Sequence, residues 1–256
     1  MKRIILCEGK TDAILISYFL EKRFGWSYIF EHPLKLPVAN ARNEELNWYR
    51  HSERVELGQE LAVWGVGSVS QIPVKLKAVV ENNQRNPRPE DRFECVVLFF
   101  DHDDPTEVCL NTVQKWIADA NLVLANELQL GEWVDTEMDL LGVTPPGKYR
   151  LRLLTIVLPP DGLGALETFL IGCWQQFSEA DKQLAEAARA FIVDLPELPK
   201  QTYLNHRRLP DKACLGIILS VFSPDGLFLK IDPKLKSVPW EQVEDVLAVY
   251  GKLEAL

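Results

Sequence analysis

The chain has 256 residues, of which 47% are hydrophobic and 25% are charged, a globular composition that excludes global disorder. Its length suits one large α/β domain, or one domain with a substantial extension. The formal net charge of −9 argues against a high-affinity nucleic-acid binder, which gains most of its affinity by neutralising phosphates. An enzyme that reaches phosphates through bound metal ions remains compatible with this charge.

The cysteines and the N-terminal residues exclude several further classes of protein. The five cysteines are scattered and form no C-x-x-C pair, so the sequence indicates neither a disulfide framework nor a structural zinc site. The apolar start is only four or five residues long before Glu8, which is too short for a signal peptide. No run approaches the roughly 18 apolar residues of a membrane span. We therefore expect a cytoplasmic protein with reduced thiols and no membrane partner.

The first predicted strand is Arg3–Cys7, which is apolar and ends directly before the carboxylate of Glu8. A helix is expected over residues 12–24, because apolar residues recur there on one helical face and Asp12 or its neighbour can cap the start. Residues 27–59 are polar, and we interpret them as an insertion with a helix around Asn43–His51.

Two more strands follow in the middle of the chain. The second is Glu60–Trp64, with Gly65 and Gly67 in the turn after it and a helix that runs to about Asn82. The third, Cys95–Phe100, is continuously apolar, as expected for a strand that is covered on both faces of a parallel sheet.

The alternation of strands and helices predicts one α/β core. A helix is expected over residues 105–120, followed by a polar connection over residues 121–147. The fourth strand is Arg150–Pro159, and the helix after it begins near Glu167. This alternation indicates a mostly parallel sheet with helices on both faces, in a core domain that spans residues 1–177.

A mainly helical extension over residues 178–256 is expected to pack on this core. Helices are predicted over Ser178–Phe191, Lys212–Phe222 and Trp240–Lys252. The segment over residues 195–236 holds seven basic and four acidic residues, so it is positively charged in an acidic protein. It is the candidate nucleic-acid edge of the molecule, although a solvated loop has the same composition.

Acidic side chains follow three of the predicted strands. Glu8 follows the first strand, Asp101 and Asp103 follow the third, and Glu167 follows the fourth. Ligands of open α/β sheets bind beyond the carboxyl ends of the strands, so we expect these side chains to converge there. Converging carboxylates repel one another unless a cation lies between them, and oxygen ligands of this kind suit Mg²⁺ or Mn²⁺. The sequence therefore predicts a divalent-metal site at this edge.

Four motifs give this pattern a family resemblance. "CEGKTD" after the first strand, "WGVGS" after the second and "FFDHDD" after the third resemble a Toprim domain, the catalytic module of topoisomerases, DnaG-type primases and OLD-family nucleases. An "LE" pair opens the helix after the fourth strand in OLD-like and stand-alone members, as in "ALETFL" here. The resemblance covers residues 3–175 well and residues 200–230 loosely. It implies a three-layer α/β sandwich with a mostly parallel central sheet, extended by C-terminal helices.

The resemblance also implies metal-assisted chemistry on phosphodiesters, most simply that of a nuclease. In the Toprim picture Asp101 and Asp103 hold Mg²⁺ or Mn²⁺. Glu8 is a general acid/base or a second metal ligand, and Glu167 is an outer or second-site ligand. Lys212 matches the family's C-terminal lysine and would stabilise the developing charge on the phosphate.

Substrate contacts are expected from the turns and from the basic segment. Lys10 follows Glu8 closely enough to reach a substrate phosphate, and Gly65 and Gly67 lie in the turn beside it. Arg207 and Arg208 are the paired cations of the candidate nucleic-acid edge. The substrate class is DNA or RNA, and the sequence does not distinguish the two.

Other interpretations stay open. The chain contains no P-loop, whereas OLD-like nucleases carry an ATPase in the same chain, so an ATPase or another protein could act in trans. A non-catalytic Toprim-like subunit that binds a metal or a nucleotide is the main alternative, and a small-molecule α/β enzyme is another. In structural terms, Glu8 could cap a helix, Asp104 could cap the helix after it, and His102 could be an exposed loop histidine.

Overall fold

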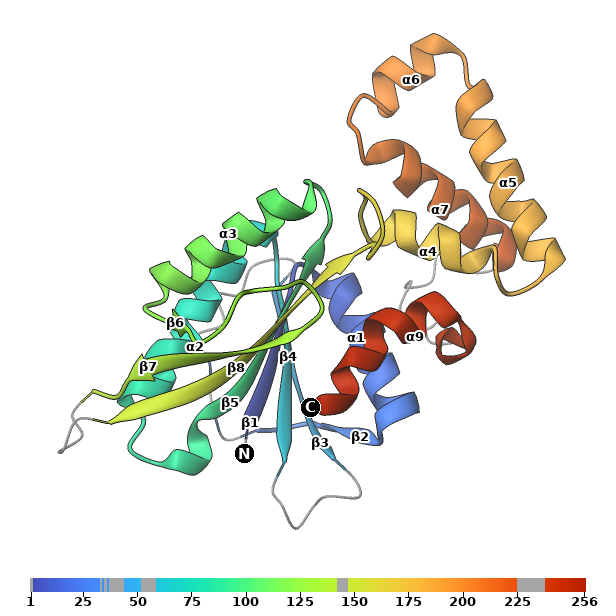
Figure 1. Ribbon diagram of the computed structural model, residues 1–256. Coiled ribbons are helices and arrows are strands. Elements are labelled where there is room, and N and C mark those ends of the chain that lie inside the picture. The colour runs from blue at the N-terminus through green and yellow to red at the C-terminus, as the bar shows by residue number, and fades with distance from the viewer. Residues whose placement is uncertain are drawn as a thin grey trace.

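The computed structural model describes residues 2–32, 34, 36, 44–51, 59–141, 147–224 and 238–256 as an α/β protein with one eight-stranded mixed sheet. The strand order across the sheet is β2-β3-β4-β1-β5-β8-β7-β6 (Figure 1). The four central strands are parallel: β4 (Glu60–Val66), β1 (Lys2–Cys7), β5 (Phe93–Asp101) and β8 (Lys148–Leu158). These are the four strands that the sequence predicts, and each is confirmed within a few residues.

The outer strands are antiparallel, so the sheet is mixed rather than mostly parallel. They are β2 (Trp26–Ile29), β3 (Glu44–His51), β6 (Val123–Leu124) and β7 (Trp133–Asp139). The helix expected around Asn43–His51 is wrong, because the described residues of that stretch form β3, which pairs with β2 on one side and β4 on the other. Positions 33, 35, 37–43 and 52–58 of the expected insertion lie outside the described residues.

The central strands are apolar throughout because helices cover both faces of the sheet. In β1, Ile4 and Leu6 join one hydrophobic cluster, and Ile5 and Cys7 join the other. The helices α2 (Ile72–Arg85) and α3 (Thr106–Asp119) lie over the first cluster, whereas α1 (Lys10–Phe24) and α9 (Glu244–Tyr250) lie over the second (Figure 1). Successive side chains of a strand point to opposite faces, so each strand contributes to both cores.

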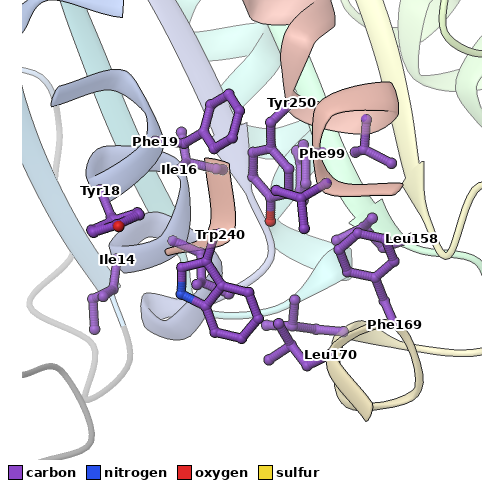
Figure 2. Packing of buried hydrophobic residues seen from close by; sticks show 14 of the residues in the cluster. Ile14, Ile16, Tyr18, Phe19, Phe99, Leu158, Phe169, Leu170, Trp240 and Tyr250 are labelled. Carbon is purple, nitrogen blue, oxygen red and sulfur yellow. The ribbon is translucent and has the colours of Figure 1, made fainter. Parts of the chain in front are cut away.

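The C-terminal residues belong to the core beside α1. Figure 2 shows Tyr250 between Phe19 of α1 and Phe99 of β5, and the ring centroids are 5.3 Å and 5.4 Å apart respectively. Trp240, in a short 3-10 helix (Trp240–Gln242), is also almost completely buried. The last residues form another 3-10 helix, Gly251–Ala255. The expected helix over residues 240–252 is thus broken into three short pieces that pack on the same cluster.

An arm of three helices projects beyond α4 (Leu166–Trp174), as Figure 1 shows. It consists of α5 (Glu179–Asp194), α6 (Glu197–Tyr203) and α7 (Leu209–Phe222). Apolar residues of α5 and α7 join the cluster that contains α1 and α4, so the arm is fixed to the core at its base. Short 3-10 helices occur at Val69–Gln71 and Pro89–Asp91.

The cysteines and the helix lengths both bear on predictions made from composition. All five cysteines are buried and free, as the scattered spacing predicts. Among the described residues, no helix is both long and apolar enough to cross a membrane.

Candidate functional site

Three carboxylates come together where β1 and β5 end, and we call them the carboxylate cluster: Glu8, Asp101 and Asp103. Strands β1 and β5 are parallel neighbours with Cys7 paired to Phe99, so Glu8 and Asp101 leave the sheet side by side. Asp103 follows two residues later. The local sequence accounts for this placement, because each apolar run stops where its strand emerges from between the two helical layers.

Arg208, the residue immediately before α7, holds the carboxylate cluster together. Its Nη1 donates to Asp101 Oδ2 at 2.7 Å and lies 3.8 Å from Glu8 Oε1. Its Nε donates to Asp103 Oδ1 at 3.2 Å, and its Nη2 pairs with the other oxygen of Asp103. One guanidinium group therefore contacts all three carboxylates. The sequence assigns Arg208 to substrate, whereas the structure pairs it with the expected metal ligands.

Arg207 adds a second cation on the outer side of Asp103. Its guanidinium group donates to the backbone oxygen and to the carboxylate of Asp103. The two arginines thereby bring the loop between α6 and α7 back from the arm to the carboxyl ends of the strands.

Asp101 is the most constrained member of the cluster. Its Oδ1 accepts a hydrogen bond of 3.0 Å from the backbone N–H of Leu166, at the N-terminus of α4. Burial and then the charge of Glu8 raise the pKa of Asp101 to about 6, although Arg208 and the Leu166 N–H act in the opposite direction. The contacts of Arg208 and the Leu166 N–H therefore do not fully offset the burial of this carboxylate and its repulsion by Glu8.

Glu8 carries a second sign of incomplete compensation. Its Oε2 atom is buried and has no hydrogen-bond partner among the described residues. A buried carboxylate oxygen without a partner costs free energy that folding normally avoids. Glu8 does not cap α1, although the sequence left that role open. Its partnerless oxygen is more consistent with a residue that contacts a ligand. The cap of α1 is in fact Gly9.

Asp12 is a member of the site that the sequence suggests only as a helix cap. It lies at the third position of α1, where its carboxylate accepts the Gly9 N–H at 2.8 Å. Burial and then the charge of Asp101 raise the pKa of Asp12 to about 8. The signal in the sequence is its spacing: a second acid follows Glu8 by four residues, across a turn that opens a helix at the ligand-binding edge.

These side chains line one cavity of about 300 Å³. Most of the predicted site residues lie on its wall: Glu8, Lys10, Gly67, Asp101, Glu167, Arg208 and Lys212. Lys10 pairs with Glu45 at 2.8 Å, and Lys212 lies 3.7 Å from Glu167. A second cavity of about 140 Å³ adjoins the first, and it is lined by Asp103 and Arg207 with Arg208 and Glu167 common to both.

Gly65 is not in the turn that the sequence predicts but within β4, and it does not line either cavity. A Cβ atom at this position would lie 2.8 Å from the backbone oxygen of Gly9. Gly65 therefore allows β4 to approach the turn that carries Glu8. Gly67, with φ of 95°, does lie in the bend after the strand.

Two neighbours of the cluster also differ from expectation. His102 is buried rather than exposed, because its backbone N–H donates to Leu158 and its ring nitrogen Nδ1 lies 3.0 Å from the Pro159 oxygen. Asp104 does not cap α3, whose N-cap residue is Pro105. Neither His102 nor Asp104 lines the two cavities described above.

The carboxylate oxygens of the cluster are chemically suited to a hard divalent cation. In this structure Arg208 contacts all three carboxylates instead. Among the residues that the structure describes, no three Asp, Glu, His or Cys side chains stand where they would hold a metal ion. The three carboxylates nevertheless supply only oxygen atoms, one of which, Glu8 Oε2, is buried without a partner. Oxygen donors with net negative charge are what Mg²⁺ and Mn²⁺ select.

No protein-family model and no curated protein matches this chain. Among solved structures, the crystal structure of hypothetical protein PH0156 from Pyrococcus horikoshii OT3 matches with 14% sequence identity and a TM-score of 0.46. That match covers 94% of this chain and 98% of that chain. A similarity of this size carries no argument about the activity of this chain.

Proposed function

We propose that the carboxylate cluster is a Toprim-like site for divalent-metal-dependent phosphodiester chemistry on nucleic acid, most simply that of a nuclease. The observation that carries the proposal is the convergence of Glu8, Asp101 and Asp103 at the adjacent ends of β1 and β5. The central strand order β4-β1-β5-β8, with helices on both faces, supports the three-layer sandwich that the motif resemblance implies.

In this proposal Asp101 and Asp103 hold Mg²⁺ or Mn²⁺. The bound ion would polarise a phosphoryl oxygen and lower the pKa of a water molecule. The Leu166 N–H fixes Oδ1 of Asp101, so Oδ2, which accepts from Arg208, is the oxygen that would bind the ion. Glu8 has a buried oxygen without a partner, and it can accept a proton from the attacking water or hold a second cation.

Positive groups on the cavity wall are suited to stabilising the negative charge that develops on the phosphate. Lys10 and Lys212 both line the cavity, on the sides of α1 and α7 respectively. A lysine ammonium near a phosphate stabilises the negative charge that develops there in the transition state. Lys212 is assigned this role, and Lys10 is assigned to substrate binding.

The experiment that tests the proposal is a cleavage assay with single- and double-stranded DNA and RNA, in Mg²⁺ or Mn²⁺. We expect cleavage of at least one substrate that requires the metal. Glu8→Gln and Asp101→Asn should each lower the rate by at least about 100-fold, because both groups act on the reacting atoms. Asp135→Asn, which removes a partly exposed carboxylate on β7, is the matched control and should leave the rate unchanged.

A non-catalytic subunit that binds a metal or a nucleotide is the second candidate. It is favoured by the Arg208 contacts, which partly compensate the negative charge of the cluster from within the chain, and by the net charge of −9. Metal binding without cleavage of any nucleic acid, alone or with an ATPase partner, would support this candidate over the nuclease.

A further inference from the structure

We infer that Arg208 is a displaceable internal cation, which occupies the space between the carboxylates until a divalent ion replaces it. The inference rests on the proposed function, because it concerns how the same site is kept when no metal is bound. In this inference Arg208 competes with the metal ion for the carboxylates and does more than contact the substrate. It sets the metal concentration at which the site becomes competent.

The guanidinium group of Arg208 occupies the space between the carboxylates of the cluster. Nη1 of Arg208 lies 2.7 Å from Asp101 and 3.8 Å from Glu8, while Nη2 pairs with Asp103. The guanidinium group thus stands between carboxylates that would have to close on an ion at roughly 2.1 Å. Among the described residues no metal-holding group of three acids exists in this arrangement.

The permanent positive charge of Arg208 opposes the binding of a second cation in the same space. A guanidinium group cannot lose its proton in a protein, so it cannot make room for a cation by becoming neutral. Two cations in one gap repel each other, and the smaller, doubly charged ion gains more from each carboxylate. Binding of the divalent ion therefore requires the side chain of Arg208 to move away.

The side chain of Arg208 has an adjoining cavity into which it can rotate. The side chain of Arg208 is 23% exposed, and it forms part of the wall between the two cavities. The second cavity is lined by Glu167 and Asp211, whose carboxylates can receive the guanidinium group. Arg207 bonds the Asp103 backbone oxygen and the outer side of the Asp103 carboxylate, so it can hold this loop while the side chain of Arg208 rotates and α7 stays in place.

This exchange predicts a measurable penalty on metal binding. The apparent affinity for the ion is the intrinsic affinity reduced by the fraction of molecules in which Arg208 has left the cluster. A variant without the arginine loses this penalty. Loss of any nearby positive charge would also favour a cation, so the comparison needs a variant that removes a charge from the same cavity without uncovering the carboxylates.

The test is isothermal titration calorimetry with Mn²⁺ on the full chain and on Arg208→Gln and Lys10→Gln. Lys10 lines the same cavity, and its Nζ pairs with Glu45 at 2.8 Å. We expect Arg208→Gln to bind Mn²⁺ at least about tenfold more tightly than the wild type, and Lys10→Gln to differ by less than about threefold. Arg208→Lys keeps the charge but not the fork of donors, so it should fall between the wild type and Arg208→Gln. It also serves if Arg208→Gln fails to fold.

The outcomes separate the two proposals. Unchanged or weaker Mn²⁺ binding in Arg208→Gln, with binding in the wild type, would overturn the inference and leave the metal site intact. An equal gain in Lys10→Gln would also overturn it, because general electrostatics would then suffice. If no variant binds Mn²⁺, the proposed function fails and the inference fails with it. Binding in Arg208→Gln alone supports the inference in its strongest form.

Discussion

The two ends of the central strands carry the same kinds of charged side chain with opposite consequences. At the amino end, Lys2 of β1 pairs with Asp91 at 2.7 Å and with Glu60 of the neighbouring β4 at 3.7 Å. At the carboxyl end, Arg208 pairs with Asp101 and Asp103. Both arrangements place a cation between carboxylates of neighbouring segments, and both are largely shielded from water.

The pKa shifts distinguish the two ends. The hydrogen bond from Lys2 lowers the pKa of Asp91, and although burial alone would raise the pKa of Glu60, hydrogen bonds from His32 and Arg50 bring it below its ordinary value. At the carboxyl end burial and neighbouring acids instead raise the pKa of Asp101 to about 6. Lys2, His32 and Arg50 therefore offset the burial of the carboxylates at the amino end, whereas Arg208 and the Leu166 N–H do not fully offset the burial of Asp101 and its repulsion by Glu8.

The largest expected difference is in the pH dependence of stability. Because the pKa of Asp12 is raised to about 8 in the folded state, that state holds a proton that the unfolded chain releases above about pH 4. The free energy of unfolding should therefore fall as the pH rises from about 4 to about 8, with a slope of up to about 1.4 kcal/mol per pH unit from this group. Asp12→Asn should flatten the slope, as measured by urea unfolding between pH 5 and pH 8.

Glu60→Gln should have the opposite effect on the pH dependence of stability, because the pKa of Glu60 is lowered and not raised. The pKa of Glu60 is lowered in the folded protein, so its stabilisation is present above the unfolded pKa and is lost as the pH falls through the folded pKa. This variant should therefore change the pH dependence only in the acid range, below about pH 4.5. Parallel curves for the wild type and Asp12→Asn between pH 5 and pH 8 would contradict the distinction between the two ends.

The next largest effect is expected at the amino end. Lys2→Met removes a side chain that is only 8% exposed and leaves Asp91 and Glu60 without its charge. We expect the free energy of unfolding to fall by roughly 2–4 kcal/mol, because two partly buried carboxylates lose their shared partner. Chemical denaturation at pH 7 measures this loss. Arg85→Gln, which breaks an exposed pair with Glu81, should cost less than about 0.5 kcal/mol, and an equal loss in both variants would refute the expectation.

A smaller effect is expected from the backbone beneath the carboxylate cluster. Gly65→Ala would place a methyl group 2.8 Å from the Gly9 oxygen, so the turn that carries Glu8 has to shift. We expect a loss of roughly 1–3 kcal/mol in the free energy of unfolding, together with weaker Mn²⁺ binding. Gly172→Ala in α4 meets no atom within 4 Å, so it should be neutral or slightly stabilising. Identical behaviour of the two alanine variants would show that the close approach is unimportant.

The sequence predicted the parts of the fold that local pattern determines. The central strands are continuously apolar because both their faces are covered, and they were found within a few residues. Strand β7 was missed, although its buried residues Val134, Thr136 and Met138 alternate with more exposed ones, the pattern of an antiparallel strand near an edge. Strand β3 was taken for a helix, because its charged and polar residues suit a helix and only the pairing with β2 and β4 decides otherwise.

The candidate site shows the same boundary between local and long-range information. The placement of Glu8, Asp101 and Asp103 follows from the parallel direction of β1 and β5, which the sequence predicted. The contact of Arg208 with this cluster spans more than 100 residues and depends on how the helical arm folds back, which no local pattern encodes. The sequence predicts Asp12 only as a cap, because Asp101, whose charge acts on it, lies far along the chain at the end of β5.

The measurement that tests the account most directly is the crystal structure of the wild-type protein grown with Mn²⁺, with the ion located by its anomalous scattering. The account predicts a peak in contact with Asp101 and Asp103, beside Glu8, and Arg208 turned away from both aspartates. A well-ordered structure with no peak at the carboxylate cluster, and with Arg208 still bonded to both aspartates at saturating Mn²⁺, would contradict it.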